Sequence, residues 1–239
     1  MVANIERILV CIPTYNESEN IIEILNRIRK IDNFHILIID DNSPDGTADL
    51  VSRQNFSDVT ILHRASKGGL GPAYIAGFSW AIEHGYSYVV EFDADGSHHP
   101  EQLFKLIDSL DGSEMVIGTR WMPGGSVENW PFIRRAISRI GTFYAKKVLR
   151  LPYRDLTSGF RVISIAALKK VDFQNVESLG YGFQIEMALR IHEAGLSIVQ
   201  VPITFTERTR GASKMSKKIV FEALVQTTKW GLQRLVNAR

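Results

Sequence analysis

Short, continuous apolar runs recur along the first half of this chain, and they constrain its fold more than any other feature. A polar residue, proline or glycine follows each run, and the runs span residues 8–12, 34–39, 59–62, 88–92 and 115–117. Strands buried on both faces of a sheet have this pattern, whereas strands with one solvated face alternate apolar and polar residues. Helical patterns lie between the runs, at 21–28, 47–53, 72–83 and from Pro100 onward. The alternation predicts an α/β protein with a mostly parallel sheet and helices on both faces.

The second half is less regular, and it indicates further elements without a second domain. We expect helices at 133–149, 183–193 and 213–236, and strand-like segments at 156–163 and 196–201. The last helix is amphipathic, and its apolar side holds Phe221, Leu224, Val225, Leu232, Leu235 and Val236. No repeat, low-complexity tract or linker interrupts the chain, so residues 1–239 are expected to form one domain.

The composition excludes several classes of protein. With 239 residues, 45% hydrophobic and 23% charged, the chain has a globular rather than a disordered composition. Its apolar runs are far shorter than the ~18 residues needed to span a bilayer, and no early segment has the order of a signal peptide. Cys11 is the only cysteine, which excludes a disulfide framework and a cysteine-based zinc site. Together these features favour a reducing, cytosolic compartment.

Charge is unevenly distributed along the chain. Residues 1–119 hold 8 Lys/Arg and 18 Asp/Glu, whereas residues 120–161 hold 9 and 2, and residues 205–239 hold 8 and 2. An acidic half followed by basic blocks suggests one region that holds a cation and another that meets anions. Solvated surface charge without a specific role is the alternative.

Acidic or polar clusters follow three of the predicted strands, at 13–17, 40–43 and 93–95. Ligands of an open parallel sheet bind beyond the carboxyl ends of the strands, so we expect these clusters to converge there. A helix cap would explain one such cluster, but three at one edge favour a ligand site.

The pair Asp93 and Asp95 is the most specific of these features. Two carboxylates separated by one small residue can meet a single hard cation, and Mg²⁺ or Mn²⁺ often bridges such oxygens to a diphosphate. His98 and His99 follow, beside Pro100, where helix entry is favoured over metal ligation.

The glycine-rich segment 68–71 does not match a dinucleotide-binding loop. It lacks the third glycine of the fingerprint and does not follow the first strand, and the chain has no Walker lysine pattern. Its glycines are expected to let the backbone approach other backbone or a ligand.

Seven motifs occur in a fixed order along the chain. The first four are Val-Cys-Ile-Pro-Thr-Tyr-Asn-Glu at 10–17, Asp-Asp-Asn-Ser-Pro-Asp-Gly-Thr at 40–47, Lys-Gly-Gly-Leu-Gly-Pro-Ala-Tyr at 67–74 and Asp-Ala-Asp-Gly-Ser-His at 93–98. These resemble the family 2 glycosyltransferases, which have the GT-A fold. The others are Gly-Thr-Arg at 118–120, Asp-Leu-Thr-Ser-Gly-Phe-Arg at 155–161 and Arg-Thr-Arg-Gly-Ala-Ser-Lys at 208–214. They narrow the resemblance to the polyprenol-phosphate (dolichol-phosphate) mannosyltransferases.

The resemblance implies a metal-dependent enzyme with a GT-A fold. Its reaction would be the inverting transfer of mannose from GDP-mannose to a polyprenyl (dolichyl-type) monophosphate. Residues 1–119 would hold the nucleotide sugar and the metal, residues 120–212 the acceptor, and residues 213–239 would form a C-terminal helical tail.

The resemblance also assigns residues to the donor. The residues that would bind the nucleotide sugar are Pro13, Tyr15, Glu17, Asp40 or Asp41, Asp93, Ala94, Asp95, Arg208 and Lys214. Mg²⁺ or Mn²⁺ would bind Asp93 and Asp95, and a third ligand, typically glutamine in the family, corresponds to Ser97 here. Water or His98 is an alternative to that hydroxyl. Arg208 and Lys214 would belong to a mobile loop that closes over the donor phosphates.

Acceptor-phosphate binding is implied for Arg120, Arg134 and Ser138, with Arg120 counted among the catalytic residues beside Asp93 and Asp95. A phosphate monoester has a second pKa of about 6, so the acceptor is already a nucleophile at neutral pH and needs no strong general base. Arginine suits the binding of this dianion because its planar fork stays charged. Asp155 is expected either to contact the sugar or to orient an arginine.

Three other functions remain open from the sequence. The same chemistry with glucose from UDP-glucose is the nearest alternative. A nucleotide-sugar-binding subunit without activity and a nucleic-acid-binding protein are the others, and the basic blocks contain no recognised nucleic-acid fold.

A polyprenyl phosphate resides in a membrane, so the protein is expected on the cytoplasmic membrane face as a peripheral protein. The tail helix either contacts the membrane surface or packs on the protein's own core. In the second case an integral membrane partner protein would recruit the enzyme.

Overall fold

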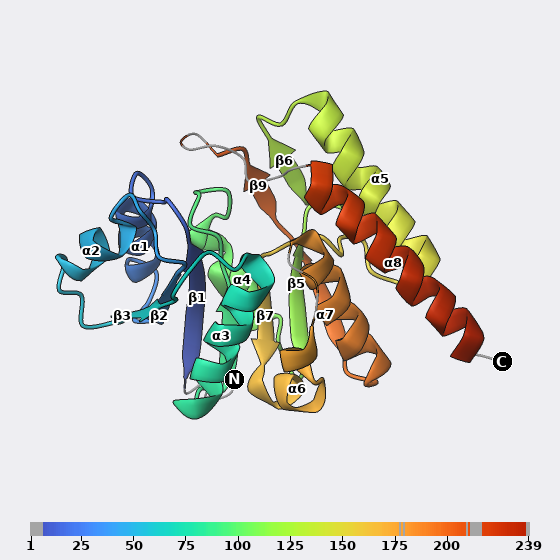
Figure 1. The fold of residues 1–239 in the computed structure, drawn as a ribbon, viewed down its shortest axis with the longest axis horizontal. Helices are drawn as coiled ribbons and strands as arrows, with labels where there is room; N and C mark the ends of the chain where they lie inside the picture. The colour runs from blue at the N-terminus through green and yellow to red at the C-terminus, as the bar shows by residue number, and fades with distance from the viewer. Residues whose placement is uncertain (1–6, 177, 179, 209, 211–216, 238–239) are drawn as a thin grey trace.

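The computed structural model describes residues 7–176, 178, 180–208, 210 and 217–237. Its centre is a seven-stranded sheet with the order β3-β2-β1-β4-β7-β5-β8 (Figure 1). The strands are β1 (Ile8–Thr14), β2 (His35–Asp40), β3 (Val59–His63), β4 (Tyr88–Glu91), β5 (Met115–Thr119), β7 (Arg161–Ser164) and β8 (Ile198–Pro202). All neighbours pair in parallel except β7, which is antiparallel to β4 and β5. The expected mostly parallel α/β sheet is confirmed.

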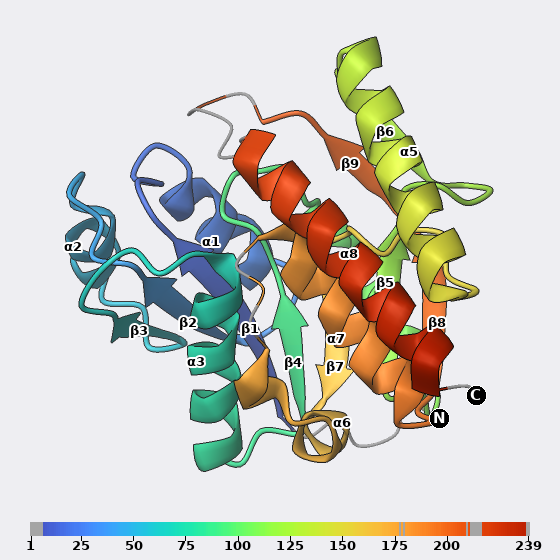
Figure 2. The same cartoon turned by 45° about the vertical axis from the view of Figure 1, so that its right-hand side comes forward.

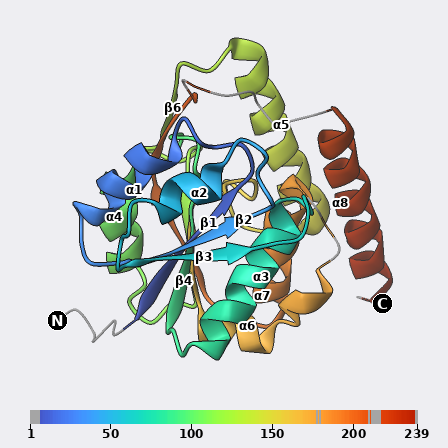
Figure 3. The same cartoon turned by 60° about the vertical axis from the view of Figure 1, so that its left-hand side comes forward.

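Helices cover both faces of the sheet, which explains why the strands are apolar without alternation. In β1, Val10 and Ile12 pack on one face and Leu9 and Cys11 on the other. The first face carries α1 (Ile21–Arg29), α2 (Thr47–Ser52) and α4 (Leu103–Asp108), which follows the short 3₁₀ helix Pro100–Gln102. The second face carries α3 (Leu70–Glu83), α6 (Ile165–Lys170) and α7 (Tyr181–Glu193), with a 3₁₀ turn at Phe173–Asn175 between the last two (Figure 3).

Two long helices, α5 (Phe132–Leu149) and α8 (Lys217–Asn237), lie side by side outside α7 (Figure 2). They meet closely at Gly231, where a Cβ atom would stand 2.4 Å from Val148 Cγ1. The most buried residues of α8 are small, with Ala223 9% and Thr227 1% exposed, and the partly buried Trp230 packs beside them. The apolar stripe predicted for the tail therefore faces outward, and the alternative that it packs on the protein's own core is wrong. Phe221, for example, is 68% exposed.

A short ribbon lies beside the main sheet at its carboxyl edge, and the sequence did not predict it. β6 (Ser126–Glu128) pairs in parallel with β9 (Thr204–Thr206). A bridge between Phe205 and His98 joins this ribbon to the segment that follows β4. The ribbon thus brings residues after β8 next to the Asp93–Asp95 motif.

The strand expected at 156–163 begins only at Arg161, and residues 156–160 form a loop. The side chain of Arg161 is fully buried and donates hydrogen bonds to three backbone carbonyls, those of Leu156 (2.8 Å), Ser158 (2.7 Å) and Gln184 (2.7 Å). The buried carbonyl groups of Leu156 and Ser158 thus accept hydrogen bonds from a side chain, so this segment can stay a loop without pairing to a neighbouring strand.

Candidate functional site

A cavity of about 520 Å³ opens at the carboxyl edge of the sheet, and we call it the sheet-edge cavity. The ends of β1, β2 and β4, the loop before α3 and two residues of α8 line it. Eight residues expected to bind the nucleotide sugar meet in this lining: Pro13, Tyr15, Glu17, Asp41, Asp93, Ala94, Asp95 and Arg208. Lys214 lies outside the described residues.

Of the two acids that follow β2, Asp41 lines the cavity and Asp40 does not. Asp40 accepts hydrogen bonds from Thr14 Oγ1 (2.9 Å) and from Ser43, so it ties the ends of β1 and β2 together. Asp41 pairs closely with Arg64 and accepts bonds from the backbone N–H groups of Gly68 (2.9 Å) and Gly69 (3.3 Å). Asp41 therefore holds the glycine-rich loop against the cavity.

Asp93 and Asp95 differ in their electrostatic environments. Arg208 Nη2 lies 2.7 Å from Asp95 Oδ2, and the backbone N–H of Ser97 donates to Asp95 Oδ1 at 3.0 Å. Burial opposes the charge of Asp95, but these partners lower its pKa below the ordinary value. Burial and the charge of Asp95 raise the pKa of Asp93 to about 7. Without a further cation, the two carboxylates are thus not both fully charged at neutral pH.

These residues fit a hard divalent cation, as judged from their own chemistry. The Asp93 side chain is 31% exposed at the cavity, and Arg208 already stands beside Asp95 as a cation. The buried hydroxyl of Ser97 has no hydrogen-bond partner. Within the part of the chain that the structure describes, no group of three or more His, Cys, Asp and Glu could hold a metal. The protein would supply two carboxylates, and a diphosphate and water would complete the coordination shell.

His98 does not act as a helix-entry residue, because its ring lies in the core beneath Asp93. The ring stacks on Phe160 at 4.9 Å between centroids, and its Nδ1 accepts a hydrogen bond from the backbone N–H of Asp93 (3.1 Å). Burial lowers the pKa of His98 to about 3, so the imidazole is neutral. Its role is therefore to hold the backbone of the Asp93–Asp95 motif in place through this hydrogen bond.

Arg120 directly follows β5, and Asp155 holds its side chain in place. The guanidinium donates to both carboxylate oxygens of Asp155, at 2.7 and 2.8 Å, and Asp155 is fully buried. Three rings, those of Trp121, Trp130 and Phe205, lie within 5.3–5.7 Å of Arg120 Cζ. Of the two roles considered for Asp155, this geometry is that of an arginine-orienting residue.

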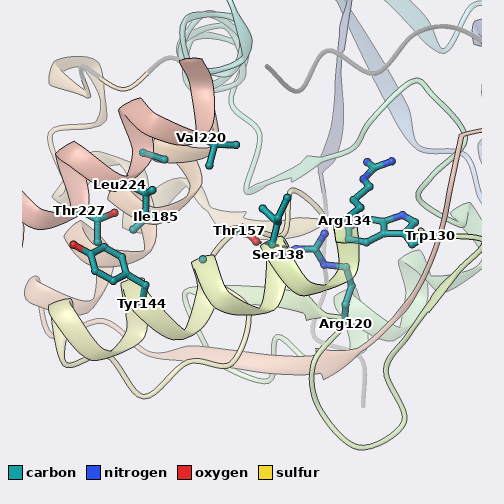
Figure 4. A pocket seen from close by; sticks show the side chains of 13 residues that line it. Arg120, Trp130, Arg134, Ser138, Tyr144, Thr157, Ile185, Val220, Leu224 and Thr227 are labelled. Carbon is teal, nitrogen blue, oxygen red and sulfur yellow. Dashed lines mark hydrogen bonds between the residues drawn. The ribbon is translucent and has the colours of Figure 1, made fainter. Parts of the chain in front are cut away.

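A groove between α5 and α8, the α5–α8 groove, brings together Arg120, Arg134 and Ser138 (Figure 4). It holds about 80 Å³, and its basic end lies beside Trp130, whose ring is 4.4 Å from Arg134 Cζ. Apolar side chains such as Ile137, Ile185, Val220 and Leu224 line most of the rest, together with the hydroxyl-bearing Tyr144, Thr157 and Thr227. The groove is therefore charged at one end and apolar along its length.

Two residues of these sites were missed by the sequence analysis, Trp130 and Glu207. Glu207 forms a close ion pair with Arg134, and Trp130 stacks on the same arginine. The two members of the ion pair are 73 positions apart, so no local pattern indicates it. The ribbon strand β9, which ends one residue before Glu207, brings it to α5.

Residues 9–172 match the protein family described as Glycosyl transferase family 2. The chain belongs to this family. It is 46% identical over 240 residues to the polyprenol monophosphomannose synthase of Mycolicibacterium smegmatis, with 98% of this chain and 91% of that protein covered. It is 48% identical over 229 residues to the undecaprenyl-phosphate mannosyltransferase of Micrococcus luteus, with 95% and 94% covered. The resemblance seen in the motifs is confirmed.

Solved structures of glycosyltransferases share the fold. One is the glucosyl-3-phosphoglycerate synthase of Mycobacterium tuberculosis, crystallised with Mn²⁺, UDP-glucose and phosphoglyceric acid, at a TM-score of 0.71 and 16% identity over 98% of this chain and 84% of that chain. Another is the mannosyl-3-phosphoglycerate synthase of Rubrobacter xylanophilus, at a TM-score of 0.70 and 16% identity over 97% and 75%. The expected GT-A fold is confirmed. Among the described helices of this family 2 member, none has the length and apolar character to cross a membrane.

Proposed function

We propose that this protein transfers mannose from GDP-mannose to a polyprenyl monophosphate, with inversion at the anomeric carbon. The observation that carries the proposal is that a carboxylate-lined cavity lies near a groove that is basic at one end and apolar along its length. This pairing suits a charged sugar donor and a lipid phosphate. The names of the relatives support mannose and the polyprenyl phosphate.

Residues 1–119 would bind the donor. Pro13, Tyr15, Glu17 and Asp41 would contact the nucleotide, since all four line the sheet-edge cavity. Asp93 and Asp95 would hold Mg²⁺ or Mn²⁺, which when bound offsets the charge that develops on the leaving diphosphate. Arg208, at the same cavity, and Lys214 would meet the donor phosphates.

Residues 120–212 would bind the acceptor. Its phosphate is mostly a dianion at neutral pH and can attack directly, so the protein has to overcome the repulsion between two anionic substrates. Arg120, fixed by Asp155, and Arg134 would do so through charge-assisted hydrogen bonds, with Ser138 as a further donor. This accounts for the basic block at 120–161.

The prenyl chain would leave along the apolar part of the α5–α8 groove towards the cytoplasmic face of a membrane. Exposed apolar residues flank the groove on both helices, among them Ile140 (67% exposed) on α5 and Val225 (50%) on α8. Large exposed apolar residues on neighbouring helices are typical of a membrane or partner contact. The tail at 213–239 would thus contact the membrane surface, alone or with an integral membrane partner.

One assay tests the proposal. Purified protein, detergent, Mn²⁺ and polyprenyl phosphate are incubated with radiolabelled GDP-mannose or, in parallel, UDP-glucose, and the label is followed into organic-extractable lipid. We expect transfer from GDP-mannose. Transfer from UDP-glucose alone would establish the alternative donor, and transfer from neither would refute the proposed function.

A further inference from the structure

A second basic pocket lies against α5, on a different side of that helix from the α5–α8 groove. It holds about 500 Å³, and the residues that line it include Arg120, Trp121, Arg135 and Arg139. Arg135 and Arg139 are four residues apart and so share one face of the helix, whereas Arg134 and Ser138 line the groove. None of the described residues that line this pocket is acidic.

Two of the residues that line the pocket carry hydrogen-bond donors that the protein does not use. Trp121 Nε1 and Arg135 Nε are buried and have no hydrogen-bond partner. Arg139 Cζ lies 5.1 Å from the Trp121 ring, so its guanidinium is held beside the same indole. Buried donors without an acceptor are costly, and arginine forms strong, charge-assisted hydrogen bonds with phosphate oxygens.

An apolar face of α5 lies between the two sites. Phe132, Ile133 and Phe143 are 81%, 72% and 62% exposed, on the side opposite the buried residues Ala145 and Leu149. An amphipathic helix with apolar residues flanked by arginines is typical of a helix that lies in the headgroup region of a bilayer. If this face meets lipid, the basic pocket stands at the depth of the headgroups.

We infer that the Arg135–Arg139 pocket binds the phosphate of an anionic phospholipid headgroup and so holds α5 on the bilayer, beside the acceptor groove. The inference rests on the proposed function only in taking the acceptor to be a membrane lipid. Arg120 lines both sites, but the headgroup is distinct from the acceptor, because Arg134 and Ser138 line only the groove, whereas Arg135 and Arg139 line only this pocket. The net positive charge of residues 120–161 complements such a membrane.

Vesicle flotation tests the inference with the full chain. Vesicles of phosphatidylcholine are compared with vesicles that also contain phosphatidylglycerol, for the unmodified protein and for Arg135→Gln/Arg139→Gln. The matched control is Lys169→Gln/Lys170→Gln, which removes the same charge from exposed positions on α6, at the opposite end of the molecule (Figure 1). We expect the arginine variant to lose about tenfold in binding to the anionic vesicles, and the lysine variant to lose less than about twofold.

Equal losses in the two variants would overturn the inference, because they would indicate general charge attraction. A second arm measures glycerol phosphate by calorimetry: binding of this soluble probe without any preference for anionic vesicles would assign the pocket to a free phosphate instead. Mannosyl transfer to a short, water-soluble prenyl phosphate should be unchanged in Arg135→Gln/Arg139→Gln, which also shows that the variant is folded. Failure of flotation with intact transfer rejects only the headgroup site, whereas failure of transfer by the unmodified protein rejects the proposed function.

Discussion

An arginine–carboxylate pair lies at the sheet-edge cavity and another at the α5–α8 groove. The two sites differ in which member of the pair, the carboxylate or the arginine, would bind a ligand. In the cavity, Arg208 neutralises Asp95, and the carboxylate is the group that would bind a metal. In the groove, Glu207 neutralises Arg134, and the arginine is the group that would bind a phosphate. Glu207 and Arg208 are consecutive residues directly after β9. One short segment therefore supplies the internal counter-ion for both sites.

The Arg120–Asp155 pair behaves differently from these two. Asp155 is fully buried and binds Arg120 through both oxygens, and its Oδ2 also accepts the backbone N–H of Arg120 at 3.0 Å. Breaking such a buried pair leaves an uncompensated charge that costs about 3–5 kcal/mol. Arg134 and Glu207 are 16% and 23% exposed, so their pair can open more easily. The groove thus combines one fixed and one exchangeable arginine.

The largest effect is expected at the carboxylates of the cavity. Asp93→Ala and Asp95→Ala should lower kcat/KM by about 10³-fold or more, because a metal at a leaving diphosphate contributes several kcal/mol. Far-UV circular dichroism should barely change, since both residues follow a strand end rather than fill the core. Asp108→Ala, an exposed acid on α4, serves as the control. Full activity of the unmodified protein in EDTA would contradict the metal site.

A second prediction separates the two sites. Arg134→Ala should reduce transfer by about 10²-fold, the worth of a charge-assisted hydrogen bond to phosphate, while GDP-mannose binding stays within about twofold. Calorimetry with GDP-mannose measures the second quantity. Arg120→Ala should also lower the thermal stability, because it leaves Asp155 without its partner. A loss of more than about tenfold in nucleotide affinity for Arg134→Ala would break the distinction between donor and acceptor residues.

The sequence predicted the main sheet and most of the cavity for a simple physical reason. An apolar run that is continuous over five residues, such as 8–12, indicates burial on both faces, and parallel strands bring their carboxyl ends to one edge. The motif residues at these ends had to meet. The small ribbon was not predictable in this way, because β6 and β9 have three residues each and are partly exposed. Their pairing depends on the whole fold.

The counter-ion of Arg134 was missed for a related reason. Glu207 lies 73 positions from Arg134, and its segment reaches α5 only because β9 pairs with β6. For Asp155 the sequence left two roles open, and the bonds to Arg120 decide between them. The outward direction of the α8 stripe was also left open, since the helix packs on its neighbours through small residues such as Ala223 and Gly231. A count of apolar side chains along a helix does not indicate which side is buried when glycine and alanine make the contact.

The raised pKa of Asp93 should make metal binding depend on pH. The pKa of Asp93 is about 7 in the metal-free protein, above its ordinary value of 3.8, so this group holds a proton that a metal must displace. Mn²⁺ affinity should therefore fall by up to about tenfold per unit as the pH drops below about 7 and be nearly constant above it. The metal-free protein should lose stability as the pH rises from 3.8 to about 7, because the folded state then binds more protons than the unfolded state. An unchanged slope in Asp93→Asn would contradict this assignment.

Removal of Arg208 from the cavity should strengthen Mn²⁺ binding but lower the rate of transfer. Arg208→Ala frees Asp95 from an internal cation, so Mn²⁺ should bind the nucleotide-free protein about fivefold more tightly, the range expected for a partly exposed ion pair. Transfer should fall, since the variant lacks the contact that we propose between Arg208 and the donor phosphates. Arg210→Ala is the control, because Arg210 pairs with Glu23 at the surface. Weaker Mn²⁺ binding in Arg208→Ala would show that the arginine assists the metal and does not compete with it.

The smallest effect is expected at the counter-ion of the groove. Glu207→Gln keeps the size of the side chain but removes the charge that neutralises Arg134, so the KM for a soluble prenyl phosphate should fall about threefold, the worth of a partly exposed ion pair. Glu128→Gln, on the neighbouring strand β6, is the matched control. A higher KM would mean that Glu207 positions Arg134 for the phosphate. Mn²⁺ titration of Glu207→Gln tests whether the two ion pairs are coupled, since Glu207 and Arg208 are consecutive residues. A change in Mn²⁺ affinity would show that loss of the Glu207–Arg134 pair weakens the Arg208–Asp95 pair. An unchanged affinity would show that the two pairs open independently.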